Sequence, residues 1–451
     1  MSMNPGSISL EGVRMPAWLV RYDKKGICTS PKTRDALLAA VSANPQAPVI
    51  LFSHGWNNEY EEATQRYAGL LRHLEAHRTT YPGSGTEPIF VGILWPSTWL
   101  SFDKGPDMAT TSVAGSRSDP FERFEQELAE QLEGDERARF YALVEQDRLD
   151  ATQTKELVEL TARAVKNDAG SPDSREGNER KSPQPADMYR GMDALQRLAG
   201  PVPDDSDELQ EGGTLGQGPQ GAVQDAGFLS FLDPRNALRV ASVYQMKDRA
   251  GTVGWNGVAA LLSDLLARSP APVHVVGHSY GAKVVLSAIA SKDLPRQVTS
   301  VLLLQPAVSH LCFAAEVPGR EGAGGYVAVP QRVKNGLAMT CSAWDFPLHT
   351  VFHKALRRDD DLGELQVGAQ HAGEAVEAGD PPSKYAALGG YGPRKARETM
   401  VNEMPAPGTP LPQLRAPGLI AFDGTKGKRV SSHGDVSTQY TAWLLHQQMV
   451  A

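Results

Sequence analysis

Short apolar runs alternate along this chain with segments in which apolar residues recur every three or four positions. Apolar runs of strand length occupy residues 18–22, 48–53, 88–95, 273–277, 298–304, 337–341 and 419–422. Helical spacing is found in residues 31–43, 59–77, 255–267, 282–290 and 436–449. Continuous apolar runs between amphipathic segments are typical of parallel strands that helices cover on both faces. The pattern therefore predicts an α/β fold with a mostly parallel central sheet flanked by helices.

The alternation is interrupted in residues 105–236, which contain no strand-like apolar run. Residues 121–164 are rich in charge and carry apolar residues at helical intervals. Residues 168–185 and 202–224 are polar and rich in glycine and acidic residues, a composition that buries too little apolar surface to order a chain. We interpret the whole block as a helical, partly disordered cap or lid inserted into the core.

A second interruption is the polar, turn-rich stretch at about residues 358–412. We place the first half of the core in residues 13–104, the cap in 105–236 and the second half of the core in 237–451, with the polar stretch as an insertion. A chain of 451 residues is long enough for one large domain with insertions of this kind.

Composition and charge narrow the class of protein. Apolar residues make up 41% of the chain and charged residues 22%, which is typical of a globular protein. The 53 acidic and 45 basic side chains give a net charge of −8. A protein that binds nucleic acid usually presents a basic face to the phosphates. We therefore expect no nucleic-acid partner.

Three cysteines, Cys28, Cys312 and Cys341, lie in or beside apolar stretches. They are too few and too scattered for a disulfide framework or a zinc site, so we expect buried free thiols and a reducing compartment. The first twelve residues show no basic region followed by an apolar run, and no uninterrupted apolar stretch reaches about 18 residues. The sequence predicts a cytoplasmic protein without a membrane span. Export by a signal-independent route would leave no mark in it.

The main chemical motif is Gly-His-Ser-Tyr-Gly at residues 277–281. A buried strand is predicted to enter it and a helix to leave it, as in a nucleophile elbow, where a serine sits on a sharp, strained turn. Gly277 and Gly281 would give the strand and helix room to approach. The pattern predicts Ser279 as a nucleophile. The alternative is an ordinary strand-to-helix turn with a solvated serine.

A second motif follows the earlier buried strand, in the sequence Ser-His-Gly-Trp-Asn-Asn at residues 53–58. A serine hydrolase with a nucleophile elbow directs two backbone N–H groups at the oxyanion of its intermediate. One comes from the residue after the nucleophile and one from a loop after an earlier strand. We expect Tyr280 and Trp56 to supply them, with Gly55 letting the loop turn. For His54, a structural role that braces this loop is favoured over direct catalysis.

A serine hydroxyl needs a base within hydrogen-bonding distance, and the base needs an acceptor that orients it. Of the eleven histidines, His433 is best placed, because it lies in a loop between the last strand and the final helix. Asp345 follows the strand at 337–341 and is predicted to be the acid. Asp423, just after the last strand, is the rival. Asp435 is too close to His433 in the chain to orient its imidazole well.

The chain resembles the α/β-hydrolase superfamily in its lipase and esterase-like branch. The resemblance rests on Gly-x-Ser-x-Gly at 277–281 and on His-Gly-aromatic-Asn at 54–57, and it covers about residues 18–97 and 237 to the C-terminus. It departs from the superfamily in the long helical block and in the polar insertion. The resemblance implies an α/β-hydrolase fold.

The same resemblance implies a set of roles. Ser279 would be the nucleophile, Asp345 the acid and His433 the base, in the superfamily's order along the chain. Trp56 and Tyr280 would donate to the oxyanion. The implied reaction is acyl transfer through a covalent acyl-enzyme, followed by hydrolysis.

Aromatic and apolar residues gather near the expected mouth of the site, although each could equally be ordinary core packing. They are Trp56, Trp95, Trp99, Phe102, Trp344, Phe346 and Leu348. We expect a substrate pocket lined by His54, Gly55, Trp95, Trp344 and Phe346, and a small-molecule ester or a lipid as substrate. The predicted function is a lipase- or carboxylesterase-like serine hydrolase that needs neither metal nor cofactor.

Other functions stay open at this point. A phospholipase that a bacterial secretion machine delivers as an effector would suit the absent signal peptide, and would add peripheral contact with a membrane. The same triad can hydrolyse amides. A catalytically inactive, hydrolase-like binding protein could use the cap to dock a partner, but the complete set of serine, aspartate and histidine argues against it. The sequence leaves the oligomeric state undetermined.

Overall fold

The structure is a computed structural model. It describes residues 6–55, 60–83, 86–97, 120–168, 234–291, 293–318, 322–352 and 377–450, and short pieces between 185 and 192. Nearly all of the segments 168–185 and 202–224, which we interpreted as parts of the cap, and much of the polar stretch that begins at 358 lie outside these residues.

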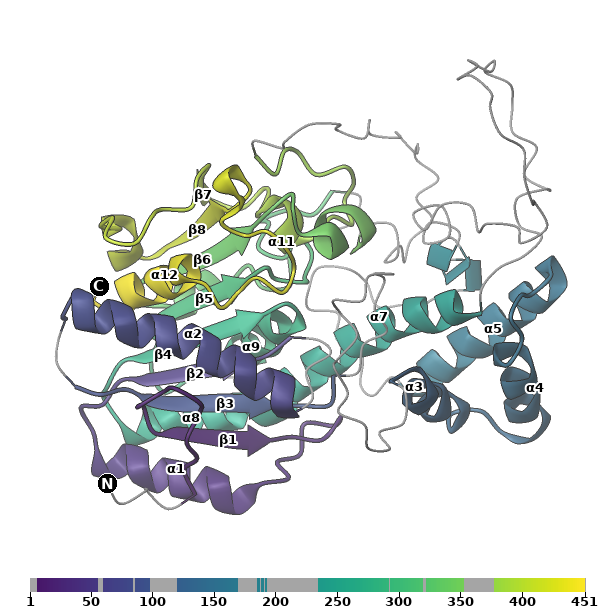
Figure 1. Cartoon of the computed structure of the whole chain (residues 1–451), viewed down its shortest axis with the longest axis horizontal. Coiled ribbons are helices and arrows are strands. Elements are labelled where there is room, and N and C mark those ends of the chain that lie inside the picture. The colour runs from purple at the N-terminus through teal and green to yellow at the C-terminus, as the bar shows by residue number, and fades with distance from the viewer. Residues whose placement is uncertain are drawn as a thin grey trace, which may run out of the picture.

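A single sheet of eight strands forms the centre of the molecule, in the order β1-β3-β2-β4-β5-β6-β8-β7, and every neighbouring pair is parallel (Figure 1). The strands are β1 (Ala17–Arg21), β2 (Val49–Ser53), β3 (Ile89–Leu94), β4 (Val273–His278), β5 (Ser300–Leu304), β6 (Gly336–Cys341), β7 (Glu398–Val401) and β8 (Gly418–Asp423). All carboxyl ends therefore lie along one edge, where loops from distant parts of the chain meet.

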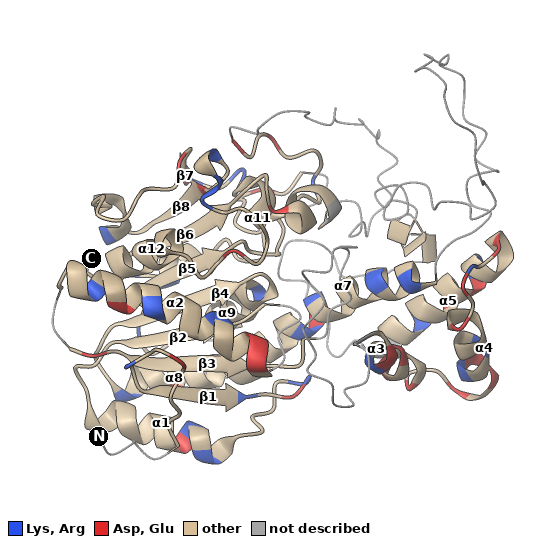
Figure 2. Cartoon of the chain, in the orientation of Figure 1, with Lys and Arg blue, Asp and Glu red and all other residues tan. Residues whose placement is uncertain are grey.

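Helices cover both faces of this sheet, as the apolar runs predicted. On one face, α1 (Pro31–Ala43), α8 (Ala259–Arg268) and α9 (Tyr280–Ser291) share a core cluster with β2 and β4. On the other face, α2 (Tyr60–Thr80) and α12 (Gln439–Met449) pack on the same strands. Figure 2 shows that charge is concentrated on the helices and loops and is nearly absent from the strands. The predicted α/β-hydrolase fold class is confirmed.

Local sequence sets where two of these helices begin. Pro31 opens α1, where its missing N–H costs no hydrogen bond. Thr438 caps α12, because its hydroxyl accepts from the N–H of Thr441 while the Thr441 hydroxyl bonds back to the N–H of Thr438. Thr438, as the N-cap of α12, therefore ends the loop that carries His433 at a defined residue.

A long helix that the sequence only partly indicated links the sheet to the inserted helices. The predicted segment 255–267 is its second half: α7 (Arg235–Thr252) runs through a π-helical turn at Val253–Val258 into α8. In α7 polar side chains such as Gln245, Asp248 and Arg249 are buried beside apolar ones. The helix thus lacks the one-sided apolar stripe that predicts a helix from sequence.

The helices of the insertion pack on the far end of α7, away from the sheet (Figure 1). They are α3 (Pro120–Ala129), α4 (Gly134–Val144) and α5 (Ala151–Asp168). Their apolar residues Phe124, Leu128, Leu143 and Leu157 are fully buried and join the same core cluster as α7. The helical character expected for residues 121–164 is confirmed. None of the described helices is long and apolar enough to cross a membrane.

The stretch called a polar insertion contains two ordered features that the sequence did not predict. A half-exposed edge strand, β7, pairs with β8. The short helix α11 (Leu388–Tyr391) is buried against the ends of β5 and β6: the N–H of Gly389 bonds the Pro306 carbonyl, and its own carbonyl accepts from Ser342. A four-residue edge strand and a glycine-rich turn carry too few apolar residues to be recognised from sequence.

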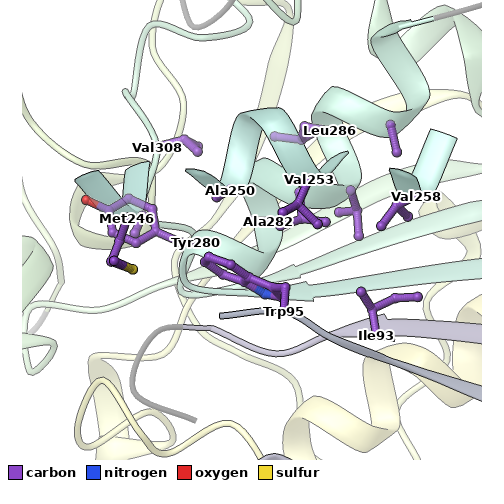
Figure 3. Close-up of a cluster of buried hydrophobic side chains, with 14 of the residues drawn as sticks. Ile93, Trp95, Met246, Ala250, Val253, Val258, Tyr280, Ala282, Leu286 and Val308 are labelled. Atoms are coloured by element: carbon purple, nitrogen blue, oxygen red, sulfur yellow. The ribbon is translucent and has the colours of Figure 1, made fainter. Parts of the chain in front are cut away.

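The π-helical turn brings the backbones of α7–α8 and α9 into direct contact. A Cβ atom added at Gly254 would lie 2.2 Å from the carbonyl oxygen of Val284. Figure 3 shows the cluster around this crossing, in which Ala250, Val253 and Ala282 pack closely. The absence of a side chain at Gly254 therefore sets the distance between α9 and the helix that carries the insertion.

We expect Gly254→Ala to destabilise the protein by about 1–3 kcal/mol, because the methyl group must push two packed helices apart. Gly418→Ala is the matched control, since a Cβ at Gly418 has nothing within 4 Å. Urea unfolding of both variants measures the difference. Equal stability of the two would contradict this account of the crossing.

Candidate active site

Ser279 lies at the sharp turn between β4 and α9, with a left-handed φ of 53°. A non-glycine residue holds such a backbone only where its surroundings fix it. Here the Ser279 N–H donates to the carbonyl of Leu304, and its carbonyl accepts from the N–H groups of Ala282 and Ala307. The strained turn expected from Gly-His-Ser-Tyr-Gly is therefore present and is anchored to β5.

Three glycines make this turn sterically possible. A Cβ at Gly281 would lie 2.1 Å from the Ser53 carbonyl oxygen, and one at Gly277 would lie 2.7 Å from Cα of Ala282. A Cβ at Gly55 would approach the Ser279 Cβ to 2.6 Å. Strand, helix and the loop after β2 can thus come together only with hydrogen at these positions.

The three residues proposed from sequence as nucleophile, base and acid form one line of hydrogen bonds. His433 Nε2 is 2.9 Å from Ser279 Oγ, and His433 Nδ1 is 2.8 Å from Asp345 Oδ2. Ser279 and Asp345 are fully buried, and the imidazole side chain is 16% exposed. Since a carboxylate only accepts, Nδ1 carries the proton and Nε2 presents its lone pair to the hydroxyl.

Asp345 lies in the loop after β6, where its two oxygens have separate partners. Oδ2 faces His433, and Oδ1 accepts from the N–H of Leu348 at 3.0 Å. The next turn is held further by the His349 N–H, which bonds the carbonyl of Asp345. The carboxylate is thereby fixed in the orientation that holds the imidazole.

The two rival carboxylates bond elsewhere. The oxygens of Asp423 accept from the N–H groups of Ala378 at 2.6 Å and Thr425 at 2.8 Å. Asp435 accepts from the N–H and hydroxyl of Ser431 within its own loop. Among these three aspartates, Asp345 alone has a hydrogen bond to His433 in the part of the chain that the structure describes.

His54 braces the loop after β2. Its Nδ1 bonds the Gly55 carbonyl at 2.6 Å, and its Nε2 accepts from the Trp95 N–H at 3.4 Å. Its ring stacks on Trp95, whose indole N–H bonds the His54 carbonyl. Burial lowers the pKa of His54 to about 4, so the ring is neutral. These contacts match the structural role favoured from the sequence.

The two expected oxyanion donors can be placed only in part. Trp56 lies outside the described residues, directly after Gly55. Tyr280 opens α9, and N–H groups of a first helical turn have no acceptor within the helix. Its ring is buried under α7, where the hydroxyl bonds the Val243 carbonyl at 3.2 Å (Figure 3).

The expected pocket residues differ in exposure. His54 and Trp95 are buried in their mutual stack. Trp344 is half-buried, with its indole N–H bonded to the Thr425 carbonyl and Lys428 over its ring. Phe346, directly after Asp345, is 41% exposed and is the most accessible of the proposed aromatic residues that the structure describes. Trp99 and Phe102 lie outside the described residues.

Two residues of the site were not predicted from the sequence. His278 and Gln305 are buried at the ends of β4 and β5, and both bond the loop that carries His433. The only signal in the sequence was their position, next to Ser279 and just after a predicted strand. Among the described residues no group of three or more histidine, cysteine, aspartate or glutamate side chains could hold a metal ion.

Comparison with known proteins gives one match. Residues 30–136 match the model of a family described as "Alpha/beta hydrolase of unknown function (DUF900)". The match contains β2, β3 and the loop with His54 and Gly55, and it ends before Ser279, Asp345 and His433. No curated protein and no solved structure matches the chain. The match and the parallel sheet together identify an α/β hydrolase fold.

The buried histidines make the fold sensitive to acid. Burial lowers the pKa of His54, His274 and His310 to about 4. Unfolding returns each to its ordinary value of 6.5, so the unfolded state binds more protons below that pH. The contribution of these neutral imidazoles to stability is therefore fully present above pH 6.5 and is lost as the pH falls toward 4. At pH 5 each histidine lowers the free energy of unfolding by about 2 kcal/mol.

Urea unfolding near pH 7 and near pH 5 measures this loss. In His274→Gln we expect the difference between the two conditions to shrink by about 2 kcal/mol, since one titrating group is gone. A wild-type protein equally stable at both pH values would contradict the assignment of neutral buried imidazoles.

Proposed function

We propose that the protein is a serine hydrolase that cleaves carboxylic esters through an acyl-enzyme, as a lipase or carboxylesterase does. The observation that carries the proposal is the hydrogen-bonded line from Asp345 through His433 to Ser279. It ends on a serine with φ of 53° at a strand-to-helix turn. Nucleophile, base and orienting acid in this arrangement support acyl transfer.

In the proposed mechanism, His433 Nε2 takes the hydroxyl proton as Ser279 Oγ attacks the ester carbonyl carbon. Asp345 stabilises the imidazolium that forms, and the intermediate's oxyanion points toward the N–H groups of Tyr280 and Trp56. His433 then gives the proton to the leaving alcohol. Water, deprotonated by the same imidazole, attacks the acyl carbon of the acyl-enzyme. The bond to Ser279 Oγ then breaks, His433 returns the proton to that oxygen, and the acid is released.

The choice of an ester with an apolar acyl group rests on the surroundings of the triad. Phe346 is exposed directly beside the acid, on the edge of the sheet where Ser279 lies. An exposed aromatic ring at the mouth of a site offers apolar contact to a substrate chain. The proposed substrate is accordingly an uncharged ester with a hydrophobic acyl group.

Labelling with a fluorophosphonate probe tests the nucleophile. The wild-type protein should be labelled, and Ser279→Ala should not be, because the probe forms its covalent bond with an activated serine oxygen. Circular dichroism of the variant serves as the control for folding. Label that persists in Ser279→Ala would refute the assignment.

The acid is tested with a matched pair of variants. Asp345→Asn should lower kcat for a nitrophenyl ester by roughly 10³–10⁴-fold, because the amide no longer orients and stabilises the imidazolium. Asp423→Asn changes a buried aspartate at the end of the neighbouring strand β8, which among the described residues bonds only backbone N–H groups, and should reduce kcat far less. Similar losses in the two variants would contradict the choice of Asp345.

The pH profile tests the base. Activity should fall on the acid side, since a protonated imidazole cannot accept the serine proton. The measurement is kcat/KM for the ester between about pH 5 and pH 8, under conditions where the protein stays folded. A flat profile over this range would count against His433 as general base.

A further inference from the structure

The loop that carries His433 is held by its own carbonyl groups. Three consecutive carbonyl oxygens accept hydrogen bonds from side chains outside the loop. Gln305 Nε2 donates to Ser432 at 3.2 Å, His278 Nε2 to His433 itself at 3.0 Å, and Arg66 Nη1 to Gly434 at 2.9 Å. Every peptide unit around the imidazole is therefore tied to another element.

The three donors come from different parts of the fold. His278 is the last residue of β4, Gln305 directly follows β5, and Arg66 lies on α2. Two neighbouring strand ends and one helix of the covering layer thus converge on one loop. The Ser432 and Gly434 carbonyls also accept from the N–H groups of Asp435 and Val436, so the side-chain donors add to the contacts within the loop.

We propose that His278 and Gln305 are positioning residues for His433, acting through the carbonyl groups of residues 432 and 433. This inference rests on the proposed function and deepens it. The imidazole has hydrogen bonds to one hydroxyl and one carboxylate, which set the direction of its ring. The position of its backbone comes from the loop, and a misplacement of about 1 Å can cost roughly 10²-fold in rate.

The chemistry of His278 suits this role. Its partner is a carbonyl oxygen, which can only accept, so Nε2 carries the proton and Nδ1 does not. The ring is buried, and burial, with Arg66 and His433 nearby, holds its pKa well below the ordinary range. His278 consequently stays neutral, and adds no charge beside the general base.

The amide of Gln305 is oriented by a further contact. Thr340 Oγ1 donates to Gln305 Oε1 at 3.2 Å and accepts from the Gln305 N–H at 3.0 Å, which leaves Nε2 as the group that faces Ser432. The backbone of Gln305 has a φ of 37°, so the residue directly after β4 and the residue directly after β5 are both non-glycine residues with left-handed φ. Such strain is retained where surrounding contacts over-determine it.

A matched pair of substitutions at residue 278 tests the proposal. In His278→Gln the side-chain amide nitrogen can reach the position of Nε2 and restore the bond to the His433 carbonyl. In His278→Asn the amide stops near the position of Nδ1, one bond short. Both variants replace the imidazole by the same neutral group in the same buried site, so they differ mainly in reach.

With the full-length protein and a nitrophenyl ester, we expect His278→Asn to lower kcat by roughly 10–100-fold with little change in KM. His278→Gln should keep kcat within a few-fold of wild type. The two variants should unfold at similar temperatures, so that a difference in kcat is not caused by a difference in stability. Amide hydrogen exchange in residues 431–436 should be faster in His278→Asn alone, which reports the loop without using activity.

Gln305→Met supplies a second variant that does not depend on residue 278. It keeps the length of the side chain but removes the donor to Ser432, so kcat should again fall while KM is retained. If His278→Asn folds poorly, the same comparison of kcat, KM and exchange is made on Gln305→Met.

Several results would overturn the proposal. One is a wild-type kcat in His278→Asn and in Gln305→Met. Another is an equal loss of kcat in both variants of residue 278, which would assign the effect to the lost imidazole. A wild-type protein that neither takes the fluorophosphonate label nor hydrolyses esters would refute the proposed function, and the positioning role with it. Labelled wild type with unaffected variants refutes the positioning role alone.

Discussion

The hydrogen bond between the His433 imidazole and the Ser279 hydroxyl joins residues 154 positions apart, and the rest of the site depends on it. It can form because β4, β6 and β8 are parallel, so that their carboxyl ends, and the loops that bear Ser279, Asp345 and His433, reach the same edge of the sheet. An antiparallel strand at any of these places would send its loop to the opposite edge. The parallel topology is thus a requirement of this hydrogen-bonded arrangement.

Two kinds of support hold this edge in place. Backbone contacts at Gly55, Gly277 and Gly281 let three chain segments approach more closely than any side chain would permit. Hydrogen bonds from buried side chains then tie the loops, as His54 does after β2 and His278 does for the His433 loop. Close packing and satisfied polar groups together maintain the left-handed backbone of Ser279, whose strain would otherwise relax.

Much of the fold could be predicted because its strands are buried on both faces. Continuous apolar runs such as Val49–Ser53 and Ser300–Leu304 indicate buried strands, because exposed segments are rarely apolar throughout. The helices between them follow from 3.6-residue spacing. The secondary structure could not be predicted where the buried residues are not mainly apolar. Helix α7 buries charged side chains along with apolar ones, and the edge strand β7 is only half covered.

The sequence by itself determined the α/β class, the turn at Ser279 and a short set of candidate partners, since these follow from local periodicity and from glycines next to a serine. It favoured Asp345 over its rival Asp423 without excluding the rival, and it did not reveal that His278 and Gln305 bond the loop of residues 432–434. Those relations join residues more than a hundred positions apart in most cases, and depend on ångström-scale distances between strand ends. Only the assembled tertiary structure sets such distances, because hydrogen bonds depend steeply on geometry that no local pattern encodes.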